Sequence, residues 1–234
     1  MTFTPPAFSG WAILMRFGQK AHLEEFRQGI LFTRPLQHFA RIEKHDLQRY
    51  DRFEGSEQIV QPKDIKQFTI RDNATGREIV TTSADFAGPI IISTGKQTNC
   101  NVFCMFSVTQ PVPKNFVDSR NYAFGDSFII VTNTQEFLNR IATAADRLGL
   151  SSQYGLVGYY DEQSYTGETG PFSKPSAFAH QREFRIVIRP GAIDTFRLNI
   201  GSLEDITTPV HPLPEINDMC DFGPEPAQRA GLKW

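Results

Sequence analysis

The sequence is poor in cysteine and has no long apolar run. Three of the 234 residues are cysteine, an odd number that leaves no complete disulfide framework and too few thiolates for a four-cysteine zinc site. No apolar stretch approaches the roughly 18 residues of a membrane-spanning helix, and the N-terminus lacks a basic segment followed by an apolar one. We therefore expect a cytoplasmic protein with reduced thiols and no membrane association.

A strong excess of either charge is also missing. The formal net charge of −2 excludes a broad basic surface that would coat nucleic acid, although a local basic patch is compatible with it. Phenylalanine is abundant, at 20 of 234 residues, which is typical of cores built from short strands and aromatic packing. Because a chain of this length more often forms one large domain than two, we expect a single β-rich domain spanning residues 1–234.

Several well-known catalytic motifs are absent. The chain has no G-x-G-x-x-G motif, P-loop, G-x-S-x-G motif or H-E-x-x-H motif, which excludes phosphate-loop and zinc-protease chemistry. Its five histidines share no metal-ligand spacing, so no metal is expected. Cys104 could act as a nucleophile with His180, but a cysteine inside an apolar strand is more often an inert buried thiol.

The hydrophobic pattern predicts many short strands and few helices. A nearly continuous apolar run at 102–108 indicates a central strand that is covered on both faces. The clearest helix is 135–148, with Thr134 as its N-cap and Gly149 as its stop. The other expected strands are 11–17, 30–33, 67–71, 77–81, 128–132, 154–160 and 196–200, and the other expected helices are 19–29 and 36–50. The expected fold class is α+β, with two small packed antiparallel sheets and the 134–148 helix against one of them.

A late stretch, SKPSAFAHQREFRIVIR at 173–189, carries the most site-like pattern. From His180 it alternates like a strand. One face holds Phe184, Ile186 and Ile188, and the other holds Gln181, Glu183, Arg185 and Val187. The second face presents an amide, a carboxylate and a guanidinium about 7 Å apart, which could line one wall of a cleft. The alternative is a surface strand with an ordinary ion pair.

Other polar positions accompany this strand. Arg16 lies near the end of the first expected strand, and Ser107 is the only hydroxyl in the central one. The loop at 49–55 mixes arginines, acids and aromatics, a composition typical of an ordered functional loop, and the loop at 161–176 could be a lid. Arg16 could equally pair with a structural acid, and Ser107 could be a satisfied core hydroxyl.

The order Arg16, Ser107 and Gln181-x-Glu183 resembles the Arg-Ser-Glu class of mono-ADP-ribosyltransferases. The K-x3-F-x2-QxEFR arrangement, which follows an FCMFS strand and an early LF-x-RPLQHF segment, is also similar to a group of uncharacterised bacterial and phage-encoded proteins. Members of the transferase family usually carry a Ser-Thr-Ser triplet. Here the serine position is filled either by Ser107 or by the Ser93-Thr94 pair.

This resemblance implies a split α+β fold that holds NAD in a cleft between two small sheets. Glu183 would stabilise the oxocarbenium-like transition state, and Arg16 would grip the pyrophosphate, with Arg34 and Arg185 as further NAD-binding residues. Ser107 would orient Glu183 or the ribose, and Gln181 would approach the acceptor. We expect Glu183→Gln to remove catalysis and leave the fold nearly intact, because the opposite face of the strand carries the packing.

The function implied is an NAD-dependent mono-ADP-ribosyltransferase that modifies a protein or a nucleic acid. A bacterial or phage toxin or defence effector fits this reading, and its partner would be an antitoxin or inhibitor protein. A rival hypothesis is a non-catalytic module that binds a nucleotide or a partner in the same cleft, and a weaker third is a nuclease.

Overall fold

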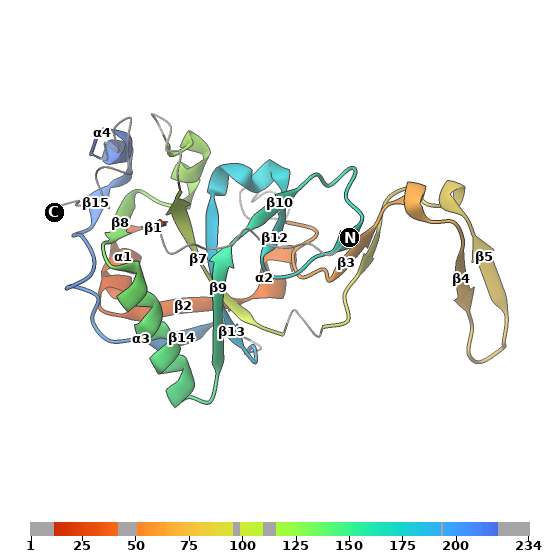
Figure 1. Ribbon diagram of the computed structural model, residues 1–234, viewed down its shortest axis with the longest axis horizontal. Helices are drawn as coiled ribbons and strands as arrows, with labels where there is room; N and C mark the ends of the chain where they lie inside the picture. The colour runs from red at the N-terminus through yellow and green to blue at the C-terminus, as the bar shows by residue number, and fades with distance from the viewer. Residues whose placement is uncertain (1–11, 42–50, 96–98, 110–115, 193, 220–234) are drawn as a thin grey trace.

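The computed structural model describes residues 12–41, 51–95, 99–109, 116–192 and 194–219. Within them the chain is a mixed α+β structure with several mostly antiparallel sheets and few helices (Figure 1). The α-helices are α1 (Lys20–Arg27), α2 (Leu36–Arg41), α3 (Thr134–Arg147) and α4 (Ile216–Met219). No described helix has the length and apolar character needed to cross a membrane.

The largest sheet has eight strands, and every pairing in it is antiparallel. Its strands are β1 (Ile13–Gly18), β2 (Ile30–Pro35), β7 (Asn101–Val108), β8 (Ser127–Val131), β9 (Ser151–Leu156), β13 (Glu183–Arg189), β14 (Phe196–Asn199) and β15 (His211–Pro212). The expectation of two small packed sheets is therefore too simple, because β7 joins the strands of both halves into one sheet.

Strand β7 is the centre of this sheet. One of its edges pairs with β13 along six residues, from Asn101 to Phe106. Its other edge pairs with β2 only at Asn101 and Val102, and with β1 only from Phe106 to Val108. Strands β1 and β2 therefore leave β7 at different ends, and the sheet is split opposite Phe103–Met105.

The two faces of the sheet are covered by different side chains. On one face, β7 and β13 contribute Phe103, Phe184 and Ile186 to a large cluster that also contains buried residues of α1 and α3. The other face carries two smaller apolar clusters, one around Phe106 and Phe128 and one around Val102 and Val187. The continuous apolar run of β7 thus follows from its burial on both sides, as the sequence predicts.

Helix α3 begins and ends one residue before the predicted 135–148. The predicted cap, Thr134, is the first helical residue, and its hydroxyl donates to the carbonyl of Ala12 at 3.1 Å. The cap is Asn133, whose side chain accepts a hydrogen bond from the backbone N–H of Glu136 at 3.0 Å. The prediction was wrong by one residue because asparagine and threonine are adjacent and both are good caps.

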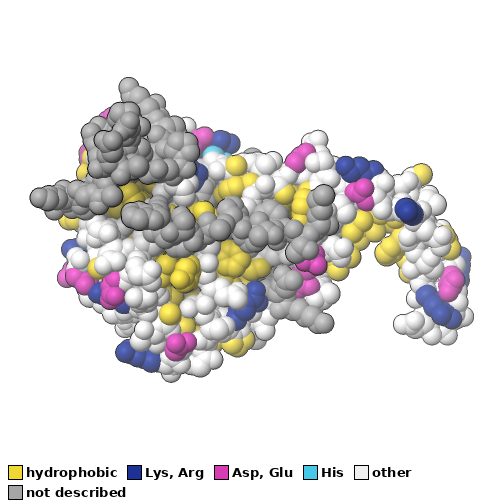
Figure 2. Space-filling model, in the orientation of Figure 1, with side chains coloured by type: hydrophobic (Ala, Val, Ile, Leu, Met, Phe, Trp, Pro, Cys, Tyr) yellow, Lys and Arg dark blue, Asp and Glu magenta, His cyan; other side chains and the backbone are white. Residues whose placement is uncertain are grey.

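Three smaller sheets lie outside the large one. Strands β3 (Gln58–Val60), β6 (Ile90–Ile92) and β11 (Gly167–Glu168) form one, and β10 (Gly158–Tyr160) and β12 (Ser173–Pro175) form a parallel pair. Strands β4 (Phe68–Arg71) and β5 (Glu78–Thr81) form a hairpin that projects far from the body as an arm (Figure 1). Apolar side chains of the arm remain exposed (Figure 2). Ile70 and Val80 are among them.

Some expected boundaries differ from the structure. The expected strand at 154–160 is two strands, β9 and β10, which pair with different partners. Strand β15 follows the expected last strand and was missed, because two residues that include a proline give no alternating pattern. The helix expected at 36–50 is described only for 36–41, since 42–50 lie outside the described residues.

Candidate functional site

A cleft of about 720 Å³ is lined by residues on both sides of the split in the large sheet. Residues of β1 and α1 line one side, β2 and β14 another, and the middle of β7 is its floor. Five of the six predicted site residues line this cleft, namely Arg16, Arg34, Gln181, Glu183 and Arg185. The sixth, Ser107, does not line it, and neither does the alternative Ser93-Thr94 pair.

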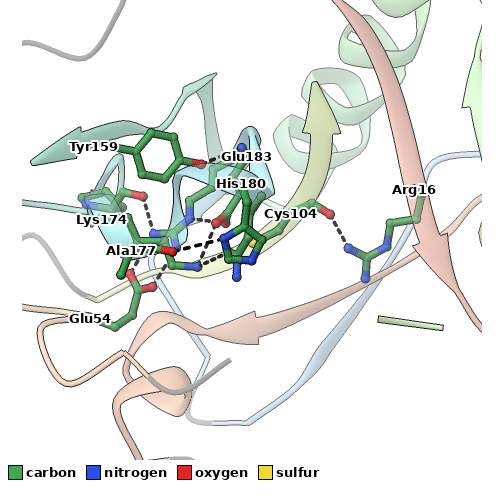
Figure 3. A network of polar contacts seen from close by, with 11 residues as sticks. Arg16, Glu54, Cys104, Tyr159, Lys174, Ala177, His180 and Glu183 are labelled. Carbon is green, nitrogen blue, oxygen red and sulfur yellow. Dashed lines mark hydrogen bonds and ion pairs between the residues drawn. The ribbon is translucent and has the colours of Figure 1, made fainter. Parts of the chain in front are cut away.

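Arg16 bridges the split. Its guanidinium donates to the backbone carbonyl of Cys104 (Figure 3), in the part of β7 that pairs with neither β1 nor β2. It also lies 4.6 Å from the centre of the Phe103 ring. An arginine in the second half of β1 is thus placed in the cleft by a backbone group that the split leaves without a strand partner.

The segment that carries Gln181 and Glu183 is not a continuous strand. Residues 176–181 form a short 3-10 helix, and β13 begins only at Glu183. Arg182 between them has φ 41° and ψ 50°, a left-handed conformation that non-glycine residues rarely adopt. The strand prediction from His180 was therefore wrong for 180–182, where this turn brings Gln181 and Glu183 to the same cleft.

Ser107 supports this turn instead of contacting Glu183. Its backbone N–H and its hydroxyl both donate to the carbonyl oxygen of Arg182, at 2.8 and 2.6 Å. The Arg182 side chain in turn donates to the carbonyl of Thr109 at 2.9 Å. The expected contact of Ser107 with Glu183 is not seen, and the hydroxyl is a satisfied core group that holds the left-handed residue in place.

A buried ion network surrounds Glu183 (Figure 3). One of its carboxylate oxygens accepts from Arg185 Nε at 2.6 Å, and the other accepts from Lys174 Nζ at 3.0 Å. Lys174 also donates to Gln181 Oε1 at 2.7 Å. Arg185 holds Glu54 through two parallel hydrogen bonds of 2.7 Å, the fork geometry that makes arginine a strong carboxylate partner.

Sequence reasoning missed Lys174 and Glu54 as site residues. Each had a signal, because Lys174 begins the K-x3-F-x2-QxEFR arrangement and Glu54 lies in the 49–55 loop. These two residues contribute to covering the polar face of β13, which was expected to be an open wall. Instead, Glu183 is only 5% exposed and Arg185 1%.

The network sets the protonation of its members. Burial would raise the pKa of Glu183, but the adjacent Arg185 guanidinium and Lys174 ammonium outweigh it and hold that pKa well below its usual range. Burial also opposes the charge of Arg185, whose pKa the two carboxylates nevertheless raise. The site thus contains two cations, Lys174 and Arg185, whose charges are balanced by the carboxylates of Glu183 and Glu54.

Asp51 adjoins this balanced network as a fifth ionisable group. Its Oδ1 accepts from the backbone N–H of Phe53 at 2.9 Å, whereas its Oδ2 is buried without a hydrogen-bond partner. Burial, reinforced by Glu54, raises its pKa to about 7. An ionised Asp51 would leave the buried cluster with an unbalanced negative charge, so the neutral form is favoured there.

Arginines also line the outer part of the cleft. Arg34 and Arg197 lie 5.9 and 5.8 Å from the ring centre of Phe32, which is 42% exposed. Arg197 pairs with Glu25 of α1 at 3.0 Å, and Arg34 contacts His38 at 2.8 Å. An aromatic ring beside two guanidinium groups is a surface suited to flat, anionic ligands.

Cys104 is not activated as a nucleophile. Burial raises the pKa of its thiol, and the neighbouring Glu183 carboxylate adds to this shift. The Nδ1 atom of His180 lies 3.1 Å from the carbonyl of Ala177. Among the described residues no group of three or more His, Cys, Asp and Glu side chains is arranged to hold a metal ion.

Comparisons with known proteins give no family. No protein-family model, no curated protein and no solved structure matches the chain.

Proposed function

We propose that this protein is an NAD-dependent mono-ADP-ribosyltransferase that modifies a macromolecule. The observation that carries the proposal is the meeting of Arg16, Arg34 and Glu183, far apart in sequence, along one cleft at the split of the sheet. The cleft volume of about 720 Å³ lies within the range of small-molecule sites. A cytoplasmic toxin or defence effector, controlled by an antitoxin or inhibitor protein, is the setting that this activity suits.

The side chains in the cleft fit the chemistry of NAD cleavage. Breaking the bond between nicotinamide and ribose creates positive charge on the sugar, which a fixed carboxylate stabilises. Glu183 is held ionised and oriented by Arg185 and Lys174. Arg16 and Arg34 supply guanidinium groups for the two phosphates of NAD. The exposed Phe32 ring lies beside the guanidinium of Arg34.

Release of nicotinamide tests this function directly. Purified full-length protein is incubated with NAD, and free nicotinamide is measured over time. We expect turnover in the wild type and a rise of roughly tenfold or more in the KM for NAD for Arg16→Lys, because an ammonium cannot form the two parallel bonds of a guanidinium. The matched control is Arg147→Lys on the surface of α3, which should behave like the wild type.

A non-catalytic nucleotide-binding module is the second candidate. The pairing of both Glu183 oxygens with cations of the chain favours it, since a structural ion pair would have the same geometry. The same experiment separates the two functions. Saturable NAD binding without nicotinamide release would contradict the transferase and leave the binding module.

A further inference from the structure

We propose that Asp51 is a positioning residue of the cleft, whose carboxylate takes the Lys174 ammonium away from Glu183 and so frees one Glu183 oxygen for the substrate. This inference rests on the proposed transferase function and adds a means of controlling it. It starts from the buried cluster of charged groups around Glu183, where Asp51 Oδ2 has no hydrogen-bond partner and Lys174 joins two other side chains.

In the structure each oxygen of Glu183 is paired with a cation of the chain. One oxygen accepts from Arg185 at 2.6 Å and the other from Lys174 at 3.0 Å. The charges of these two cations are balanced by the carboxylates of Glu183 and Glu54. Withdrawal of one cation would leave a net negative charge beside the ribose, which strengthens the stabilisation of positive charge during NAD cleavage.

Of the two cations, Lys174 is the one that can withdraw. The Arg185 guanidinium is fixed in its plane by four hydrogen bonds, three of which go to the carboxylates of Glu183 and Glu54. The Lys174 ammonium is bonded to Gln181 and Glu183. An ammonium on a flexible four-carbon stem can turn from one acceptor to another, whereas a guanidinium bound at several points must break all of them to move.

Asp51 is the acceptor to which Lys174 can turn. Its Oδ2 atom is buried without a hydrogen-bond partner. Burial and the Glu54 carboxylate raise its pKa to about 7, and the charges of Lys174 and Arg185 act in the opposite direction, which places both cations near it. A buried carboxylate that ionises needs a cation. Because Arg185 is fixed, Lys174 supplies it.

The charged and titratable groups that face Asp51 in the described part of the chain come from four segments. They are Glu54 on the same loop, Tyr160 on β10, Lys174 on β12 and Arg185 on β13. Glu54 is held by Arg185, and burial raises the pKa of Tyr160 and keeps its hydroxyl neutral. Asp51 is therefore the member of this group whose charge changes near neutral pH.

The cleft then has two states. Below about pH 7 Asp51 is protonated, Lys174 pairs with Glu183 and the cluster is neutral. Above this pH Asp51 is ionised and Lys174 pairs with it. Glu183 keeps Arg185 as its partner, and its second oxygen is open to the cleft, which Glu183 lines. Asp51 thus acts on the substrate through Lys174 and Glu183.

The pH dependence of nicotinamide release tests this role. Full-length protein is incubated with NAD from about pH 5 to about pH 9, and kcat and KM are determined at each pH. We expect the wild-type kcat to rise roughly tenfold or more and to level off above about pH 7, with KM changing less than about threefold, because Asp51 does not touch NAD. In Asp51→Asn kcat should stay at its low-pH value throughout.

The matched control is Asp146→Asn on the surface of α3, which should keep the wild-type profile. A wild-type kcat that does not change with pH would overturn the proposal. A rise of kcat that persists in Asp51→Asn would overturn it as well, because another group would then be responsible.

Lys174→Met distinguishes a lysine that withdraws from one that only supports the fold. Without the ammonium, one Glu183 oxygen is open at every pH. We therefore expect a kcat that does not depend on pH and that at about pH 5 exceeds the wild-type value roughly tenfold. A folded Lys174→Met protein with a lower kcat than the wild type at every pH would overturn the proposal.

The position of Lys174 can also be followed without NAD. The side-chain nitrogen signal of Lys174, assigned by its loss in Lys174→Met, and the carboxyl carbon signal of Glu183 are recorded by NMR across the same pH range. We expect both to shift with a midpoint near pH 7 in the wild type and to stay constant in Asp51→Asn. Signals that do not respond to pH in the wild type would overturn the exchange.

Two outcomes distinguish the exchange of Lys174 from the transferase function. Exchange without nicotinamide release at any pH would support the exchange and contradict the transferase. Nicotinamide release by a protein in which Lys174 stays on Glu183 at every pH would overturn the role of Asp51 and leave NAD cleavage standing.

Discussion

At the scale of single residues, the surroundings of Glu183 differ most from those expected from the sequence. The sequence places it on the polar face of a strand, where glutamine would be tolerated. In the structure it lies between two buried cations, Lys174 and Arg185. Its removal would leave both cations short of a partner in a medium that solvates them poorly.

Glu183→Gln is therefore expected to destabilise the fold as well as to remove catalysis. We expect a loss of about 3–5 kcal/mol in the free energy of unfolding, measured by urea denaturation. The control is Glu136→Gln on α3, where an exposed pair with Arg140 should cost less than about 1 kcal/mol.

A double variant separates the network from a general packing defect. Lys174→Met added to Glu183→Gln removes one of the two unpaired cations, so the two losses should not add. Strict additivity, or a Glu183→Gln protein as stable as the wild type, would contradict the network.

Asp51 gives the site a defined pH dependence. Its pKa is raised from 3.8 to about 7 in the folded protein, so between about pH 4 and 7 the folded state holds a proton that the unfolded state has lost. The stability that Asp51 contributes is complete below pH 4 and is lost as the pH rises toward 7. A shift of this size corresponds to on the order of 4 kcal/mol.

Asp51→Asn isolates this contribution, because asparagine keeps an oxygen for the Phe53 N–H and cannot ionise. We expect the variant to gain stability relative to the wild type as the pH is raised from 5 to 8, measured as the difference in unfolding free energy at each pH. A constant difference across this range would show that the pKa of Asp51 is not raised in the folded protein.

At the scale of elements, the sequence predicts the strands and helices whose apolar residues follow a regular pattern. The apolar run of β7 and the periodic stripe of α3 were both found close to their expected bounds. The turn at Arg182 could not be predicted, since its left-handed backbone is held by a hydrogen bond from Ser107, on strand β7, to the carbonyl oxygen of Arg182. The same reason explains why Ser107 was assigned to the cleft and not to its support.

The β4–β5 arm is an element that the body does not require. All residues of β4 are exposed, and so are most of β5. A two-stranded hairpin contributes little stability by itself. Because Phe68 pairs with Thr81, residues 69–80 can be replaced by Asn-Gly, a sequence suited to a two-residue hairpin turn.

This shortened arm is expected to change the unfolding free energy by less than about 1 kcal/mol, measured by urea denaturation. Nicotinamide release, where the wild type has it, should be unchanged, because no residue of the arm lines the cleft. A large loss of stability would mean that the arm packs on the body in solution.

At the scale of the whole molecule, the site arises from long-range pairing. Arg16 and Glu183 were found as candidates because a charged residue at the end of an apolar strand is unusual, and Arg34 because of the resemblance to the transferases. Their meeting depends on how β1 and β2 leave β7. The covering groups come from separate segments, Glu54 from the 49–55 loop and Lys174 from β12, and no periodicity relates them to β13. Sequence patterns report on neighbouring residues, whereas the burial of this network depends on contacts between residues that are far apart in the sequence.

The split in the sheet has a consequence for how Arg16 can vary. Its guanidinium completes the hydrogen bonding of the β7 backbone at Cys104 and also faces the cleft. A guanidinium has five N–H donors in one plane and can serve both surroundings at once. A mutational scan of this position should therefore find almost no tolerated residue, because selection for folding and selection for ligand affinity converge on one side chain.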